Sequence, residues 1–125
     1  MGALRWTTLT AAAEVGLTGL ILIVSPSLFG WLVLGVELNE AAQALGRIAG
    51  FAMLGFGIAS WPAGAAAGPT EQATRALLIY NVLATIYLGY LGVAAKPGVL
   101  LWPAVALHAA IAVTLACALF IREKR

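Results

Sequence analysis

Residues 99–121 read VLLWPAVALHAAIAVTLACALFI and contain no Asp, Glu, Lys or Arg. A helix of this length crosses the hydrocarbon core of a bilayer, which needs about 20 apolar residues at a rise of about 1.5 Å each. Across all 125 residues, 62% are hydrophobic and 10% are charged, whereas an ordinary soluble domain has about 25% charged residues. A soluble fold would leave much of this apolar surface in large exposed patches. The sequence therefore predicts an integral membrane protein.

Three more segments have the length and composition of membrane spans. They are residues 4–24, 41–61 and 75–94. Pro26 should end the first span, because it has no backbone N–H and disfavours helix at Ser25. Residues 26–34 then predict a short helix along the membrane surface, with Pro26 in its first turn. We expect one all-α membrane domain over residues 1–125, a bundle of four transmembrane helices with this short interfacial helix after the first span.

The connections between the later spans differ in length. Residues 62–69 are rich in Ala, Gly and Pro and predict a loop, after which Thr70 should cap the next helix and Glu71 should lie in its first turn. Residues 96–98, Lys-Pro-Gly, predict a tight turn before the fourth span, where Pro103 lies in the first turn. A connection this short makes the third and fourth spans antiparallel neighbours.

Basic side chains gather at one side of the predicted bundle. Arg5, Arg75, Arg122, Lys124 and Arg125 lie at the side of the two termini, and Lys96 lies at the other. Because cytoplasmic loops carry the excess of Lys and Arg, both termini are predicted to be cytoplasmic in a multi-pass protein of the cell (inner) membrane. We therefore interpret the net charge of +2 as a consequence of membrane topology and not as a sign of an acidic ligand. No basic patch is interleaved with aromatic residues, so the lipid bilayer, and not nucleic acid, is the expected partner.

Small and polar residues predict which faces of the spans touch protein, because helices in lipid associate through close approach and interhelical hydrogen bonds. The small residues predicted to pack are Ala42, Gly46 and Gly50 in the second span and Gly89 and Gly92 in the third. On the third span, Asn81 and Thr85 share the stripe of these glycines and should face protein. Tyr87 lies at hydrocarbon depth, where its hydroxyl needs a partner, so it is a candidate for an internal polar cluster, with plain packing as the alternative.

Three ionisable residues, Glu14, Arg47 and His108, are predicted to lie in one slab about 7 Å thick near the middle of the bilayer. An unpaired charge at this depth costs about 3 kcal/mol, so each is a functional candidate and each needs a partner. Glu14 with Arg47 is the obvious pair. The alternatives are a structural contact between Glu14 and His108, or an Arg47 side chain that extends outward to Glu40. In the last case Glu14 would stay in low dielectric as a carboxyl that exchanges a proton near neutral pH.

Two local patterns are similar to known proteins. Residues 13–18, Ala-Glu-Val-Gly-Leu-Thr, resemble the Ala-Glu-Val-x-x-Thr element in the first helix of the small multidrug resistance transporters. This resemblance implies a dimer of four-helix chains in which Glu14 binds protons and cationic drugs in exchange, although that family's third-helix tryptophan has no counterpart in residues 75–94. Ser-Pro-x-Leu-Phe-Gly at residues 25–30 and Gly-Arg-x-x-Gly at residues 46–50 look more like small bacterial four-helix membrane proteins without assigned function, which implies a fold.

The sequence offers no catalytic constellation, since it has no Asp, a single His, a single Cys and no GxxxxGK[ST] phosphate loop. We therefore expect a protein that is not an enzyme and needs no metal or cofactor, acting as an accessory or structural subunit of a membrane complex or as a homo-oligomer. The first alternative is a proton-coupled transporter for a small cationic or hydrophobic molecule, with Glu14 as the exchanging group. The second is a haem- or pigment-binding subunit, in which His108 ligates the macrocycle beside Ala104.

Overall fold

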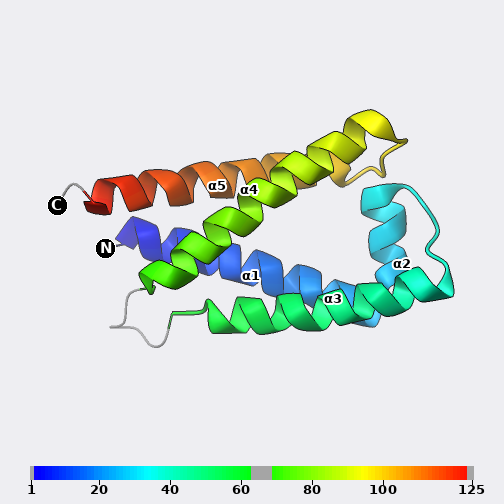
Figure 1. The fold of residues 1–125 in the computed structure, drawn as a ribbon, viewed down its shortest axis with the longest axis horizontal. Coiled ribbons are helices and arrows are strands. Elements are labelled where there is room, and N and C mark those ends of the chain that lie inside the picture. Colours follow the sequence, from blue (N-terminus) through cyan, green and yellow to red (C-terminus); the bar gives the residue numbers. More distant parts are fainter. Residues whose placement is uncertain (1, 63–68, 124–125) are drawn as a thin grey trace.

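The computed structural model describes residues 2–62 and 69–123, and within them every regular element is a helix (Figure 1). The helices are α1 (Gly2–Val24), α2 (Pro26–Phe29), a π-helical turn η1 (Gly30–Leu34), α3 (Glu40–Ala59), α4 (Glu71–Ala94) and α5 (Leu101–Glu123). α1, α3, α4 and α5 are each long and apolar enough to cross a membrane. The prediction of an all-α chain with four helices of membrane-spanning length is therefore confirmed. Most of the predicted loop at residues 62–69, together with Lys124 and Arg125, lies outside the described residues.

The helix ends follow the capping chemistry of the sequence. α1 ends two residues before Pro26, as predicted. Thr70 accepts a hydrogen bond from the backbone N–H of Ala73 at 3.2 Å, which confirms its predicted role as an N-cap. α4 therefore begins at Glu71, earlier than the predicted span, because an ion pair between Glu71 and Arg75 (2.7 Å) supports a polar first turn. The other boundaries lie within two residues of the predicted spans.

The four long helices form two antiparallel pairs, α1 with α3 and α4 with α5 (Figure 1). The tight turn at residues 96–98 joins α4 to α5, and these two helices pack on each other as predicted. α1 also contacts α4 and α5, so it is the member of the first pair that packs on the second. The buried apolar core comes from α1, α4 and α5 and consists of Ala11, Ala12, Val15, Leu77, Ile111 and Leu115. α1 is therefore the central helix of the bundle.

α1 and α3 approach so closely that their backbones touch. A Cβ atom on Gly50 would lie 2.7 Å from the carbonyl oxygen of Gly19, and one on Gly57 would lie 2.8 Å from that of Ala12. A side chain larger than hydrogen therefore has no room at either position on α3. Close contact of this kind increases the dispersion attraction between helices, which is the main attraction available in lipid. This explains why α3 carries glycines on the face that meets α1.

The end of the bundle away from the termini is covered by α2 and η1, which lie across it (Figure 1). Carbonyl groups near the end of η1 accept hydrogen bonds from the connection between α4 and α5. The N–H of Gly98 donates to Val33 at 3.1 Å, and the N–H of Leu100 donates to Leu32 at 2.8 Å. The last carbonyls of a helix have no partner inside the helix, so these bonds satisfy groups that would otherwise need water. Gly35 ends the turn with φ of 69°, which glycine adopts without strain.

Replacing Gly50 with Ala should destabilise the protein, because the new methyl group meets the α1 backbone and pushes α1 and α3 apart. Gly55→Ala is the matched control on the same helix, since a Cβ at Gly55 would meet nothing within 4 Å. We expect Gly50→Ala to lower the free energy of unfolding by about 1–3 kcal/mol, the usual cost of overpacking, and Gly55→Ala to leave it unchanged or slightly higher. Unfolding by SDS in mixed micelles measures both. Equal stability of the two variants would show that this contact does not hold α1 on α3.

Candidate functional site

Polar side chains from three helices meet inside the bundle. His108 on α5 places Nδ1 2.9 Å from Oδ1 of Asn81 on α4. On the other side of the ring, Nε2 of His108 lies 3.7 Å from Oε1 of Glu14 on α1. The side chains of His108 and Glu14 are 7% and 11% exposed, so both are almost fully enclosed by protein. Glu14, Asn81 and His108 are called the polar cluster below.

The carboxyl group of Glu14 has spare hydrogen-bonding capacity. Its Oε1 accepts a hydrogen bond from the hydroxyl of Thr18, one turn further along α1, at 3.2 Å. Its Oε2 is buried and accepts no hydrogen bond from any described residue. A buried acceptor without a partner costs about 1–3 kcal/mol. Such a group in a native protein calls for an explanation, and one explanation is that a ligand donates to it.

Aromatic rings cover one side of the polar cluster. Tyr80 on α4 meets the His108 ring edge to face, with ring centroids 5.6 Å apart. Phe56 on α3 meets Tyr80 in the same way at 6.1 Å. Apolar surroundings of this kind lower the local dielectric, so a charge in the cluster interacts strongly with its partners. Glu14 therefore needs either a proton or a positively charged partner.

A cavity of about 820 Å³ lies beside the polar cluster, between α1, α4 and α5 and with η1 at one end. The polar side chains of its wall are Thr10, Glu14, Thr18, Tyr80, Tyr87 and His108. The rest of the lining is mostly aliphatic and includes Ile21, Leu22, Val33, Leu88 and Leu107. Small-molecule sites usually have volumes of about 300–1,000 Å³ and combine an apolar wall with a few polar groups. The cavity has this character, and two members of the polar cluster, Glu14 and His108, are among its polar groups.

The structure brings together three of the six polar residues predicted for the site, namely the members of the polar cluster. Thr85 lies one turn beyond Asn81, and its hydroxyl donates to the Asn81 backbone carbonyl at 2.7 Å instead of to the cluster. Tyr87 contributes to the cavity wall but is 62% exposed. Its ring stacks on Tyr90 with centroids 6.4 Å apart, so it lies outside the cluster.

The structure does not pair Glu14 with Arg47, although this was the obvious pair from the sequence. Glu14 faces His108, whereas Arg47 is exposed on α3 and makes no ion pair within the described part of the chain. The reason is rotation about the axis of α3. Gly46 and Gly50 lie against α1 and α2, and residue 47 follows Gly46 by about 100° around the helix. Arg47 therefore points away from α1, and the alternative contact, between Glu14 and His108, is the one that forms.

The small residues predicted to pack divide into two groups. Gly50 meets α1, a Cβ on Gly46 would lie 3.0 Å from a side chain of α2, and a Cβ on Gly92 would lie 2.8 Å from a side chain of α5. Ala42 is half-buried. Gly89 differs, because a Cβ there would meet nothing within 4 Å. Its predicted contact is therefore not made within a single chain.

Sequence reasoning missed Tyr80 and assigned no role to Thr18. Thr18 follows Glu14 by four residues, the spacing at which side chains on one helix meet, so this signal was available. Tyr80 precedes Asn81 in the sequence, but its role depends on the ring of His108, which comes from another helix. Nothing in the local pattern of α4 predicts that contact.

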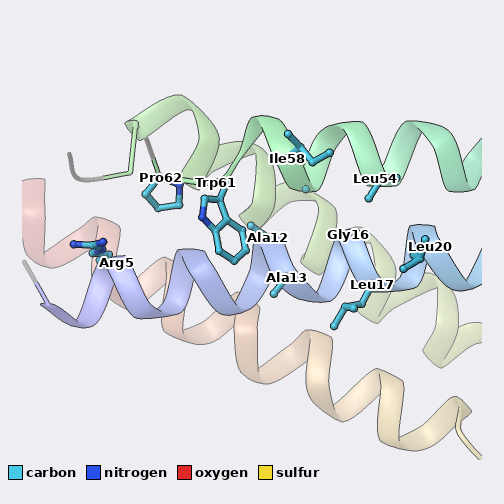
Figure 2. Close-up of a pocket in the computed structure, with 11 residues that line it drawn as sticks. Arg5, Ala12, Ala13, Gly16, Leu17, Leu20, Leu54, Ile58, Trp61 and Pro62 are labelled. Atoms are coloured by element: carbon cyan, nitrogen blue, oxygen red, sulfur yellow. The ribbon is translucent and has the colours of Figure 1, made fainter. Parts of the chain in front are cut away.

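A second, more open groove of about 870 Å³ lies between α1 and α3 (Figure 2). Ala12, Ala13 and Gly16 form its α1 side, and Trp61 lies between the two helices towards the end where Arg5 is found (Figure 2). Arg5 is the one ionisable side chain among the described residues that line this groove. The groove offers surface to apolar chains but no acid, base or nucleophile. The polar cluster is therefore the stronger candidate site.

His108 is poorly placed to ligate a metal. Its Nδ1 faces Asn81 and its Nε2 faces Glu14, whereas an axial ligand needs a ring nitrogen directed at the metal. Within the part of the chain that the structure describes, no three His, Cys, Asp or Glu side chains come together. The geometry therefore does not favour the haem- or pigment-binding alternative. The buried acceptor that is left without a hydrogen bond among the described residues is Oε2 of Glu14.

Comparisons with protein-family models, with curated proteins and with solved structures find no match for this chain. We therefore infer the function from the polar cluster and from the cavity beside it.

Proposed function

We propose that this chain is a membrane-embedded binding protein for a small, largely apolar molecule that carries one hydrogen-bond donor. The cavity between α1, α4 and α5 would hold the apolar body, and Glu14 would accept the hydrogen bond. The observation that carries the proposal is the buried Oε2 of Glu14, which has no partner among the described residues, on a side chain that lines an apolar cavity. A carrier that moves such a molecule across the bilayer would use the same site. We assign the chain no catalytic role.

The ligand's hydrogen-bond donor should contribute most of the affinity, because the ligand enters the cavity from lipid and not from water. A ligand that enters from lipid gains little by burying its apolar body, since lipid tails are already apolar. A hydrogen bond to the free acceptor of Glu14 removes a cost of about 1–3 kcal/mol. The terminal torsion of a Glu side chain is broad, so the carboxyl group can turn its free oxygen towards the cavity. Selectivity therefore depends on the donor more than on the shape of the apolar part.

Removing the acceptor should abolish selective binding of a donor. Suitable probes are β-naphthol and its methyl ether, which share an aromatic body and differ in the hydroxyl hydrogen. We expect the protein in detergent micelles to bind β-naphthol roughly tenfold more tightly than the ether, about 1.4 kcal/mol for one hydrogen bond. Glu14→Leu should lose this difference. Equilibrium dialysis measures both affinities.

Two further variants control this experiment. Glu40→Leu removes an exposed acid at the start of α3 and should leave both affinities unchanged. Ala84→Phe fills part of the cavity from α4 while keeping every polar side chain, so it should weaken binding of both probes. Equal affinity of the unmodified protein for the two probes would refute the proposal. So would a preference for β-naphthol that persists in Glu14→Leu.

We further propose that both termini lie in the cytoplasm and that α2 and η1 lie at the external surface of the cell membrane. The start of α1, the start of α4 and the end of α5 lie at one end of the bundle, and α2 lies at the other (Figure 1). Arg5 and Arg75 belong to the end that carries the termini, and Lys96 belongs to the opposite end. The excess of basic residues supports a cytoplasmic location for the first of these ends.

Labelling of introduced cysteines tests this orientation. In a Cys117→Ser background, which removes the single native cysteine, Lys96→Cys should react with a membrane-impermeant maleimide added to intact cells. Gln72→Cys, near the start of α4, should react after the cells are broken and not before. An impermeant reagent reaches position 96 on the external side of intact cells, but it reaches position 72 on the cytoplasmic side after the cells are broken. The reverse pattern would place the termini outside the cell.

A second candidate function, a subunit of a larger membrane assembly, is favoured by the position of Arg47. This residue lies about 10 Å along α3 from Glu40 and is exposed. An arginine that faces lipid at such depth costs about 3 kcal/mol unless its side chain reaches the membrane surface or meets an acid. A carboxylate of a second copy of this chain, or of another membrane protein, would supply that partner.

Native mass spectrometry of the protein, extracted gently from its own membrane, tests the second candidate. We expect a fixed stoichiometry with a partner chain, and we expect Arg47→Leu to lose that partner because its carboxylate would have no counter-ion. Arg75→Leu is the matched control, since Arg75 pairs with Glu71 on its own helix. A monomer in the unmodified protein, or an assembly that survives Arg47→Leu, would exclude this role of Arg47.

A further inference from the structure

Asn81 determines which nitrogen of His108 carries a hydrogen. The amide nitrogen of Asn81 donates to the backbone carbonyl of Leu77 at 2.8 Å. The amide oxygen therefore faces His108, at 2.9 Å from Nδ1. Turning the amide round would place its oxygen against the Leu77 carbonyl, so that two acceptors would meet. Because the oxygen of Asn81 can only accept, Nδ1 of His108 must be the donor.

The same assignment leaves Nε2 of His108 facing Glu14 without a hydrogen of its own. A neutral imidazole carries one N–H, so with Nδ1 protonated its Nε2 presents a lone pair. That nitrogen lies 3.7 Å from Oε1 of Glu14. A hydrogen bond needs a separation of about 2.7–3.2 Å, so the two groups must approach each other by about 0.5–1 Å to share a proton. An ionised carboxylate and a bare ring nitrogen are both acceptors, and they repel each other in low dielectric. A proton between them removes the repulsion, whether it belongs to the carboxyl group or to the ring.

The described side chains packed around Glu14 and His108 carry no charge, so they add nothing to the net charge of this pair. On α1, Thr18 donates a neutral hydrogen bond to Glu14. On α4, the ring of Tyr80 packs on the ring of His108 in a T-shaped arrangement, and Asn81 is an uncharged amide. From α3, Met53 lines the cavity and Phe56 packs on Tyr80. The other charged residues of α1, α3 and α4 and of the described connections lie near helix ends or in those connections, apart from Arg47, whose side chain is exposed on α3.

We propose that Glu14 and His108 share one proton, and that Asn81 fixes the tautomer and orientation of the His108 ring. The cavity therefore selects neutral hydroxyl-bearing molecules over cations. With one proton the pair has no net charge, either as a carboxyl group and an imidazole or as a carboxylate and an imidazolium. A neutral donor can then bond to Oε2 of Glu14 without moving that proton. A cation meets no net negative charge until the proton leaves. This inference rests on the proposed function for its ligand, but not for the shared proton.

The tautomer of His108 tests the shared proton without any ligand. The chain has a single His, so ¹⁵N-histidine NMR of the protein in phospholipid bilayers reports on this ring alone. We expect Nδ1 to stay protonated across the pH range in which the ring is neutral, with Nε2 hydrogen-bonded to Glu14. In Asn81→Leu the constraint is lost, and a population with hydrogen on Nε2 should appear. A neutral ring with hydrogen on Nε2 and a bare Nδ1 in the unmodified protein would overturn the proposal.

Glu14→Gln is the matched second variant, because its amide can donate to Nε2 of His108 without an exchangeable charge. The ring should keep its hydrogen on Nδ1, and Nε2 should no longer gain a proton from a neighbouring carboxyl group. Glu40→Gln makes the same chemical change at an exposed acid and should leave the spectrum of His108 unaltered. An identical titration of Nε2 with and without the Glu14 carboxyl group would overturn the shared proton.

Proton counting on ligand binding tests the preference for neutral molecules. The probes are β-naphthol and β-naphthylmethylamine, and calorimetry in buffers of different ionisation enthalpy gives the protons released. We expect β-naphthol to bind without proton release, and the amine, a cation at neutral pH, to bind roughly tenfold more weakly and to release about one proton. Equal or tighter binding of the amine would overturn the preference. If neither probe binds, the proposed function and the ligand preference both fail, and the spectrum of His108 still decides the shared proton.

Discussion

The contact between His108 and Asn81 is the interaction on which the candidate site depends, because it joins α5 to α4 and orients the imidazole ring towards α1. Both side chains are buried, Asn81 completely and His108 with 5% of its surface exposed, so the protein must supply their hydrogen-bond partners. Asn81 uses one end of its amide on its own helix and the other on His108. The ring therefore has one preferred orientation, and Glu14 meets one particular nitrogen.

The packing of α1 on α3 places Glu14 beside the His108 ring. α1 meets α3 through Ala12 and Gly19, where the two backbones are in contact. Because residues two positions apart lie on roughly opposite sides of a helix, Glu14 points away from α3 and towards the other pair. At the far end, hydrogen bonds from Gly98 and Leu100 to η1 tie the α4–α5 connection to the segment that follows α1. The polar cluster thus lies between the two helix pairs. Polar contacts join these pairs at the depth of the cluster and at the end of the bundle that η1 covers.

The chemistry of the cavity follows from this arrangement. Its wall is mostly aliphatic, and among the described residues its buried acceptor without a hydrogen bond is Oε2 of Glu14. A ligand that leaves lipid for such a site exchanges one apolar environment for another, so discrimination must come from the polar contact. The groove between α1 and α3 offers comparable volume without such a contact (Figure 2). This difference is why we propose a binding role for the first site and not for the second.

Length and apolarity are local properties, and they were enough to predict four helices of membrane-spanning length, the break at Pro26 and the cap at Thr70. The sequence by itself also determined which ionisable residues lie within those helices, because each apolar run contains so few of them. Tertiary structure decided that Glu14 meets His108 while Arg47 is exposed, and that Tyr80, rather than Tyr87, covers the cluster. Each of these outcomes depends on how a helix is rotated about its axis against its neighbours. In a lipid-facing bundle both sides of a helix are apolar, so hydrophobic periodicity does not encode that rotation.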